Sequence, residues 1–277
     1  MRRFVTGLVF AFPLVAFGGH AFAQQFTTGA CEDSSNGRGW FGGDRVRVCE
    51  LRRTTLPLVN GRVSVEGKNG SIDVVGEDRK DIALEVQVTA EAKSQGDAEA
   101  MLRKIEILTK DTIHANGPEP NGTGLFAQTH QQWSANYRLH VPRRLAANLH
   151  TLNGSVKLTD LDGAISAETT NGSVTLTDLA GDVRARTTNG SLHVALEGTQ
   201  WHGAGLSART TNGGVSVTAS QSYSAHLVAE TVNGGLHVGL PMSGQGSERK
   251  HVDGTIGQGG PTVEFETVNG GVHIGTN

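Results

Sequence analysis

The sequence contains few aromatic residues and few charged ones. Phe, Trp and Tyr make up 5% of its 277 residues, and Asp, Glu, Lys and Arg 18%; both fractions are low for a globular enzyme. The formal net charge of −3 argues against an electrostatic nucleic-acid binder, which carries a basic stripe. The 7 prolines and the 38 glycines without a Gly-X-Y period exclude a collagen-like or proline-rich disordered chain. This composition is typical of thin, repetitive β-structure with tight turns.

Sequence motifs for catalytic chemistry are also missing. The chain has no P-loop, HExxH or GxSxG motif. We therefore expect no cofactor and no enzymatic activity.

Only two cysteines are present, Cys31 and Cys49. Two cysteines at this separation, without a nearby histidine, do not make a zinc site. In an oxidising compartment a disulfide is the favoured interpretation, and chain entropy gives it roughly 3 kcal/mol of stabilisation. We expect a Cys-bridged N-terminal segment over residues 24–57.

The N-terminus is typical of a signal peptide over residues 1–23. Two arginines precede an apolar run at 4–17, and Ala21 and Ala23 supply a small-x-small cleavage site. The run is shorter than the roughly 20 residues that a membrane helix needs. We expect cleavage after Ala23, no membrane span afterwards, and a periplasmic, extracellular or cell-surface location in a bacterium.

An octapeptide repeat dominates the second half of the chain. It reads TLNGSVKL at 151–158, TTNGSVTL at 169–176 and TVNGGVHI at 267–274. Apolar and polar residues alternate on both sides of each Asn-Gly pair, as in two short strands with one buried face each. We expect the glycine of each pair to supply a positive φ, which asparagine also tolerates. These structural repeat turns are Asn153-Gly154, Asn171-Gly172, Asn189-Gly190, Asn212-Gly213, Asn233-Gly234 and Asn269-Gly270.

The repeat predicts an all-β fold, in which residues 149–277 form a parallel β-solenoid of about 18–23-residue coils. Because the same residue recurs at the same place in each coil, stacked coils can form an asparagine ladder. Asn-Gly is also the strongest hairpin signal, so an antiparallel β meander or sandwich is the alternative. In the solenoid, Glu168 and Arg186 become neighbours of opposite charge, and so do Arg209 and Glu230.

Residues 58–148 differ from the repeats. Strand patterns occur around 59–76, 81–92 and 133–142, and Asp97 begins a predicted helix. We expect the helix and its strands to cover the first rung as an N-terminal β-rich cap. The apolar face of the helix consists of Ala98, Met101, Leu102, Ile105 and Leu108.

The strand that ends in YRLHVP at 137–142, with LHTLNGSVKL at 149–158 and the tandem TTNGSV units after it, resembles a bacterial "putative adhesin" family of unknown function. The resemblance covers about residues 58–277, so the segment with Cys31 and Cys49 lies outside it. It implies an extracytoplasmic, adhesin-like β-solenoid built from β-strand repeats. No catalytic residues are recognised for that family, and none is carried over.

Two pairs of side chains are candidates for chemistry. His237 and His273 occupy the same outward position in their coils and are weak candidates for a metal site, although a structural site usually has four ligands. Asp160 and Asp178 recur in register and could act as acid and base in glycoside cleavage. Aspartate before a Gly-containing turn more often bonds its own backbone, so a structural role is favoured.

The main functional hypothesis is an exported, non-enzymatic structural or interaction protein of the cell envelope, which presents a rigid β-solenoid surface. Its expected partner is an unidentified envelope protein or polysaccharide, and not nucleic acid. The alternatives are a β-helix carbohydrate-active enzyme and a self-assembling envelope scaffold. Self-association is expected to use the C-terminal rung, because the last repeat ends at Ile274 and an open rung edge can pair with another chain.

Overall fold

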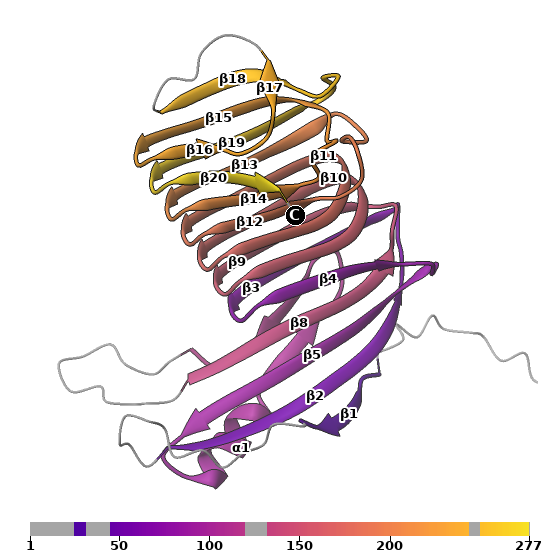
Figure 1. Cartoon of the computed structure of the whole chain (residues 1–277). Helices are drawn as coiled ribbons and strands as arrows, with labels where there is room; N and C mark the ends of the chain where they lie inside the picture. Colours follow the sequence, from indigo (N-terminus) through magenta and orange to yellow (C-terminus); the bar gives the residue numbers. More distant parts are fainter. Residues whose placement is uncertain (1–24, 32–44, 120–131, 244–249, 277) are drawn as a thin grey trace, which may run out of the picture.

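The computed structural model describes residues 25–31, 45–119, 132–243 and 250–276. The predicted signal peptide lies outside this part of the chain. The described residues form a largely parallel stack of strands with one helix near its N-terminal end (Figure 1). None of the helices in the described residues is both long enough and apolar enough to span a membrane.

The coils form two facing layers of strands. Layer 1 contains the strands that lead into the repeat asparagines, and layer 2 those that follow the repeat glycines. The long strands β10 (Val156–Asn171) and β11 (Val174–Asn189) contribute their first halves to layer 2 and their second halves to layer 1. In stacking order, layer 1 consists of β3 (Arg62–Asn69), β9 (Ala146–Asn153), β10, β11, β13 (Gly205–Asn212), β19 (Thr262–Asn269) and β15 (Ala225–Asn233). Layer 2 consists of β4 (Ile72–Glu77), β10, β11, β12 (Leu192–Leu196), β14 (Val215–Ala219), β20 (Val272–Thr276) and β16 (Leu236–Val238).

The parallel register confirms the predicted solenoid. β10 pairs with β11 at an offset of 18 residues, from Val156 opposite Val174 to Asn171 opposite Asn189. The antiparallel meander is therefore wrong for the repeats. Each Asn-Gly pair lies at the corner where the chain passes from layer 1 to layer 2, and not in a hairpin turn.

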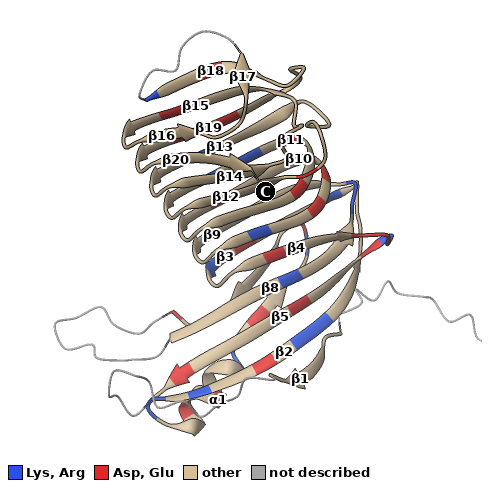
Figure 2. Ribbon diagram, viewed as in Figure 1, with Lys and Arg blue, Asp and Glu red and all other residues tan. Residues whose placement is uncertain are grey.

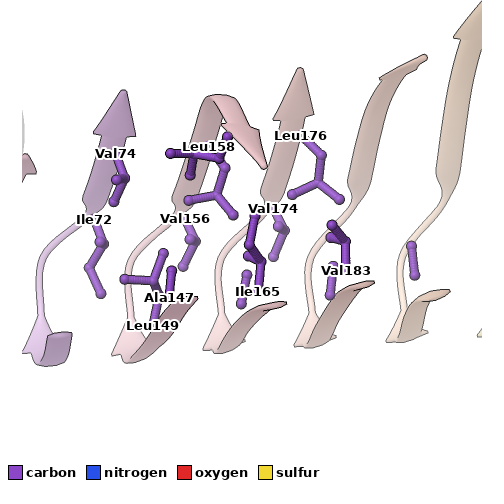
Figure 3. Close-up of a cluster of buried hydrophobic side chains, with 14 of the residues drawn as sticks. Ile72, Val74, Ala147, Leu149, Val156, Leu158, Ile165, Val174, Leu176 and Val183 are labelled. Atoms are coloured by element: carbon purple, nitrogen blue, oxygen red, sulfur yellow. The ribbon is translucent and has the colours of Figure 1, made fainter. Parts of the chain in front are cut away.

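The core lies between the two layers. Val156 and Leu158 of layer 2 and Ile165 and Ala167 of layer 1 are buried, and the equivalent residues of the other rungs repeat this pattern, except that Leu236 and Val238 of β16 are only partly buried. Figure 3 shows such side chains pointing into the space between the strands. Because the space is narrow, it is filled mainly by Val, Leu, Ile, Ala and Thr, which explains why aromatic residues are scarce.

The rungs do not all stack in sequence order. In layer 1 β19 lies between β13 and β15, and in layer 2 β20 lies between β14 and β16. The last repeat of the sequence is thus the second-to-last rung of the repeat stack. Both sides of β20 are already paired, so the last repeat does not supply the open rung edge on which the expectation of self-association was based.

Antiparallel strands close the C-terminal end of layer 1. β18 (His251–Ile256) pairs with β15, and β17 (Met242–Ser243) pairs with β18. In layer 2, β16 is only three residues long and is followed by Gly239 and Pro241. Short edge strands and nearby proline discourage edge-to-edge pairing with another chain.

At the N-terminal end, strands extend both layers. Layer 2 continues through β8 (Gln132–Pro142), β5 (Asp81–Ala92), β2 (Val46–Pro57) and β1 (Thr27–Ala30), and layer 1 through β7 (Ile113–Asn116) and β6 (Glu106–Leu108). β8 pairs parallel with β4 and antiparallel with β5. β8 and β7 therefore cover the edges of the first rung.

The helix α1 (Gln95–Leu102) packs on β2 and β5 and not on the first rung. Ser94, and not Asp97, is its N-cap, and the Ser94 Oγ accepts a hydrogen bond from the Asp97 amide at 3.2 Å. The helix ends at Leu102, before Ile105, and the Arg52 guanidinium donates hydrogen bonds to the carbonyls of Leu102 and Ile105. Leu108, predicted on the helix face, instead lies in β6 and is exposed.

Candidate interaction surfaces

The repeat asparagines form a continuous ladder along one corner of the solenoid. Each side-chain Nδ2 donates to the Oδ1 of the asparagine on the neighbouring rung at 2.8–2.9 Å. In stacking order the ladder contains Asn69, Asn153, Asn171, Asn189, Asn212, Asn269 and Asn233. All six bonds point the same way, so the two ends of the ladder differ. Within the described chain, the Nδ2 hydrogens of Asn69 have no acceptor at one end, and the Oδ1 of Asn233 has no donor at the other.

A buried threonine stabilises each corner from inside. The threonine two residues before a repeat asparagine donates its hydroxyl to the carbonyl of the repeat glycine on the preceding rung, at 2.7–3.0 Å. Each hydroxyl therefore gives a hydrogen bond to a carbonyl group whose burial would otherwise cost free energy. The residues are Thr151, Thr169, Thr187, Thr210, Thr267 and Thr231.

Close packing rather than a positive φ requires most of the repeat glycines, which corrects the sequence-based expectation for all of them except Gly213, whose φ is 158°. No repeat asparagine has a positive φ, and neither do Gly154, Gly172 and Gly190. A Cβ on these three glycines would lie 1.9–2.1 Å from the carbonyl oxygen of the repeat glycine one rung away. The corner of the solenoid is thus a stack of glycine backbones in contact. Asparagine and glycine both have structural roles there.

The outer face of layer 1 carries charges in separate blocks. Arg184, Arg186 and Arg209 lie on β11 and β13, and Glu264, Glu266 and Glu230 lie on β19 and β15. Layer 2 differs, because β12, β14, β16 and β20 have no charged residue (Figure 2). Layer 1 is therefore the charged face of the repeat stack.

The predicted charge pairs are only partly found. Glu168 and Arg186 are opposite in the register of β10 and β11, but Arg186 forms no ion pair within the described residues. Arg209 and Glu230 are not neighbours, because β19 lies between their strands. Arg209 instead contacts Glu264 at 2.9 Å and Glu266 at 3.2 Å.

Two shallow pockets lie among these charges. One of about 420 Å³ is lined by Arg186, Arg209, Glu230 and the valines Val232 and Val268. These valines are 48% and 40% exposed, which places apolar surface beside the charges. A second of about 320 Å³ is lined by residues of β10, β11 and β13 that include Arg186.

The carboxylates of this face differ in pKa. Burial raises the pKa of Glu266, and the neighbouring carboxylates of Glu264 and Glu230 raise it further against the effect of Arg209. Glu264 is also partly desolvated, yet hydrogen bonds from Arg209 and Ser207 hold its pKa below the ordinary value. Arg209 thus stabilises Glu264 more than Glu266.

The two candidate histidines are adjacent. His237 of β16 and His273 of β20 are opposite in register, and their rings stack with centroids 5.1 Å apart. His193 is two rungs from His273, because the Ser216 rung lies between them. The described residues contain no group of three or more His, Cys, Asp or Glu side chains that could hold a metal ion. The pair therefore remains a two-ligand candidate.

Asp160 and Asp178 also lie together, at positions with φ of 59° and 51°. A hydrogen bond between the two carboxyl groups raises the pKa of Asp178, and so do its burial and the charges of Asp160 and Glu197. Arg143 pairs with Asp160 at 3.4 Å. Carboxyl groups in hydrogen-bond contact are closer than the roughly 5–9 Å between glycosidase acid and base. Both residues lie inside the long strands β10 and β11, where these strands pass from layer 2 to layer 1.

The structure joins Cys31 and Cys49 in a disulfide. Cys31 directly follows β1 and Cys49 lies in β2, so the bridge attaches the edge strand β1 to the sheet. The intervening residues 32–44 lie outside the described part.

Sequence reasoning missed one pocket. It measures about 700 Å³ and lies beside the first two repeat corners, where β2, β5 and β8 extend beyond β3. Its lining includes Lys68, Asn69, Trp133 and Leu152. The exposed Leu152 before Asn153, where the next three rungs have threonine, was the available signal.

The parallel register, the two-layer core and the asparagine ladder define a β-solenoid. Residues 144–275 match the family model "Toastrack DUF4097". The chain therefore carries a DUF4097 toastrack domain.

Several solved structures are distantly similar to this chain. A "putative cell adhesion protein" from Clostridium sporogenes is 11% identical, with 82% of this chain and 99% of that chain covered and a TM-score of 0.43. A "putative adhesin" from Bacteroides fragilis is 14% identical, with 82% and 97% covered and a TM-score of 0.39. A "putative adhesin" from Parabacteroides distasonis is 12% identical, with 82% and 97% covered and a TM-score of 0.33. No curated protein matches the sequence.

Proposed function

We propose that the protein is an exported, non-enzymatic interaction protein of the cell envelope, which binds its partner through the outer face of layer 1. The observation that carries this proposal is the charge pattern of that face. Arg186 and Arg209 are register partners of like charge, as are Glu266 and Glu230. Like charges on adjacent strands destabilise the isolated protein, and a charged partner would offset this cost.

Export is supported by the N-terminal sequence and by the disulfide between Cys31 and Cys49. Fractionation of the native bacterium tests the location, and N-terminal sequencing of the mature protein should begin at Gln24. A chain that keeps residues 1–23 in the cytoplasm contradicts export.

Binding is tested by capture of envelope components on the immobilised protein. Arg186→Glu should reduce capture, since it reverses the charge of a cation that forms no ion pair within the described residues and is therefore available to a partner. Lys157→Glu is the matched control, because Lys157 is exposed on layer 2 and the charge change is identical. Equal capture by wild type and Arg186→Glu contradicts the proposed face, and equal loss in both variants indicates an effect of net charge alone.

A further inference from the structure

The pocket of about 700 Å³ lies at the donor end of the asparagine ladder. Its volume is within the roughly 300–1,000 Å³ range of small-molecule sites. Asn69 and Asn153 both line it, and both are exposed. The last amide of a chain of aligned hydrogen bonds is polarised by those behind it, so Asn69 Nδ2 is a strengthened donor.

Cationic side chains accompany this donor. Lys68 and Arg47 line the same pocket. Lys68 pairs with Glu119 at 3.4 Å and Arg47 with Glu91 at 3.0 Å, and both carboxylates also line the pocket. Lys68, Glu119 and Arg47 are mostly exposed, whereas Glu91 is half-buried. Exposed ion pairs contribute little stability, so an incoming carboxylate can replace those partners at small cost.

The pocket also has apolar surface. Leu152 is 46% exposed, and the indole of Trp133 is half-buried. The Trp133 Nε1 hydrogen is committed to the Pro118 carbonyl at 2.8 Å. The indole therefore contributes only its carbon surface to the pocket, and such a surface can pack against the C–H faces of a sugar ring.

We infer that this pocket binds a saccharide unit that carries a carboxylate, such as a uronic acid residue of a polysaccharide. Asn69, Lys68 and Arg47 supply donors and positive charge to the carboxylate, and Trp133 and Leu152 contact the ring. The inference deepens the proposed function by naming a ligand class, but it concerns a site several rungs away from Arg186, Arg209 and Glu230.

The test is calorimetric titration of the purified protein with an oligogalacturonate and with the same oligomer methyl-esterified. The free acid should bind more tightly than the ester. Asn69→Asp keeps the Oδ1 that accepts from Asn153 but removes the donor and adds a negative charge. It should weaken binding of the free acid about tenfold or more.

Asn60→Asp is the matched control, because it makes the same side-chain change at an exposed residue that does not line the pocket, and aspartate also tolerates the backbone conformation of Asn60 (φ 53°); it should leave affinity unchanged. Circular dichroism checks that both variants remain folded. The inference is overturned if neither probe binds, if the ester binds as tightly as the acid, or if Asn69→Asp binds like wild type. Any of these results, together with retained Arg186-dependent capture, rejects the pocket and leaves the proposed function standing.

Discussion

The glycine corner makes a sharp prediction about stability, and Gly190→Ala is the clearest perturbation. Gly190 does not have a positive φ, so alanine is compatible with its backbone conformation. Its Cβ, however, would lie 1.9 Å from the Gly172 carbonyl oxygen and 2.5 Å from the carbonyl carbon. Both are backbone atoms, so the clash can be relieved only by separating two rungs.

The cost follows from the bonds that cross this gap. They are Gly172 N to Asn189 O at 3.0 Å, Val174 N to Ser191 O at 3.0 Å, the Thr187 hydroxyl to Gly172 O at 2.8 Å, and Asn189 Nδ2 to Asn171 Oδ1 at 2.9 Å. At about 1 kcal/mol for each bond, their loss amounts to roughly 4 kcal/mol. That is a large part of the roughly 5–15 kcal/mol by which domains are stable.

Gly235→Ala is the control for this substitution. A Cβ on Gly235 has no atom within 4 Å, so alanine there should be neutral or slightly stabilising. Urea unfolding followed by circular dichroism measures both variants. The close-packing argument is refuted if Gly190→Ala stays within 1 kcal/mol of wild type (a bound set by the same bond energies), or if Gly235→Ala is equally destabilised.

Two smaller effects should accompany this one. Thr210→Val removes the buried hydroxyl that donates to the Gly190 carbonyl at 2.8 Å and should cost about 1 kcal/mol in urea unfolding, whereas Thr211→Val, on the exposed side, should stay within about 0.5 kcal/mol of wild type. Asp178→Asn should stabilise the protein at pH 7: the raised pKa of Asp178 means that the native state loses stability as pH rises through that pKa, and asparagine removes the charge but can still hydrogen-bond to Asp160. The gain should be below about 1 kcal/mol, because Asp178 is exposed, and should vanish below the ordinary pKa of 3.8; an equal gain at all pH values would contradict it.

The repeat unit was predictable because each of its positions has a local physical reason. Apolar alternation specifies the buried faces, and identical residues in each copy specify stacking in register. The prediction from sequence assigned the wrong physical reason to Gly154 and Gly190. Glycine is needed there because each residue contacts the backbone of the neighbouring rung, and this contact depends on the separation between rungs. The residue pattern within one rung does not specify which atoms of two neighbouring rungs come into contact.

The order of the last rungs could not be predicted for a similar reason. The corner motif specifies how a rung stacks but not on which rung, and TTNGG at 210–214 fits against both TVNGG copies, at 231–235 and 267–271. The pocket beside Asn69 depends on how far β2, β5 and β8 extend past the first corner, which their alternating pattern does not specify.

The inserted rung also explains how the end of the solenoid is closed. After β14 the chain reaches β15 across two rung spacings, about 10 Å, through residues 220–224. The hairpin of β17 and β18 then covers the outer edge of β15, so the only remaining place for the last repeat is the gap that was left between β13 and β15. The C-terminal repeat fills this gap and pairs with both neighbours. A stack of near-identical rungs thus avoids an open end in layer 1 by placing its last rung inside, and among the described residues the unpaired rung edge at this end is confined to the three-residue strand β16 of layer 2.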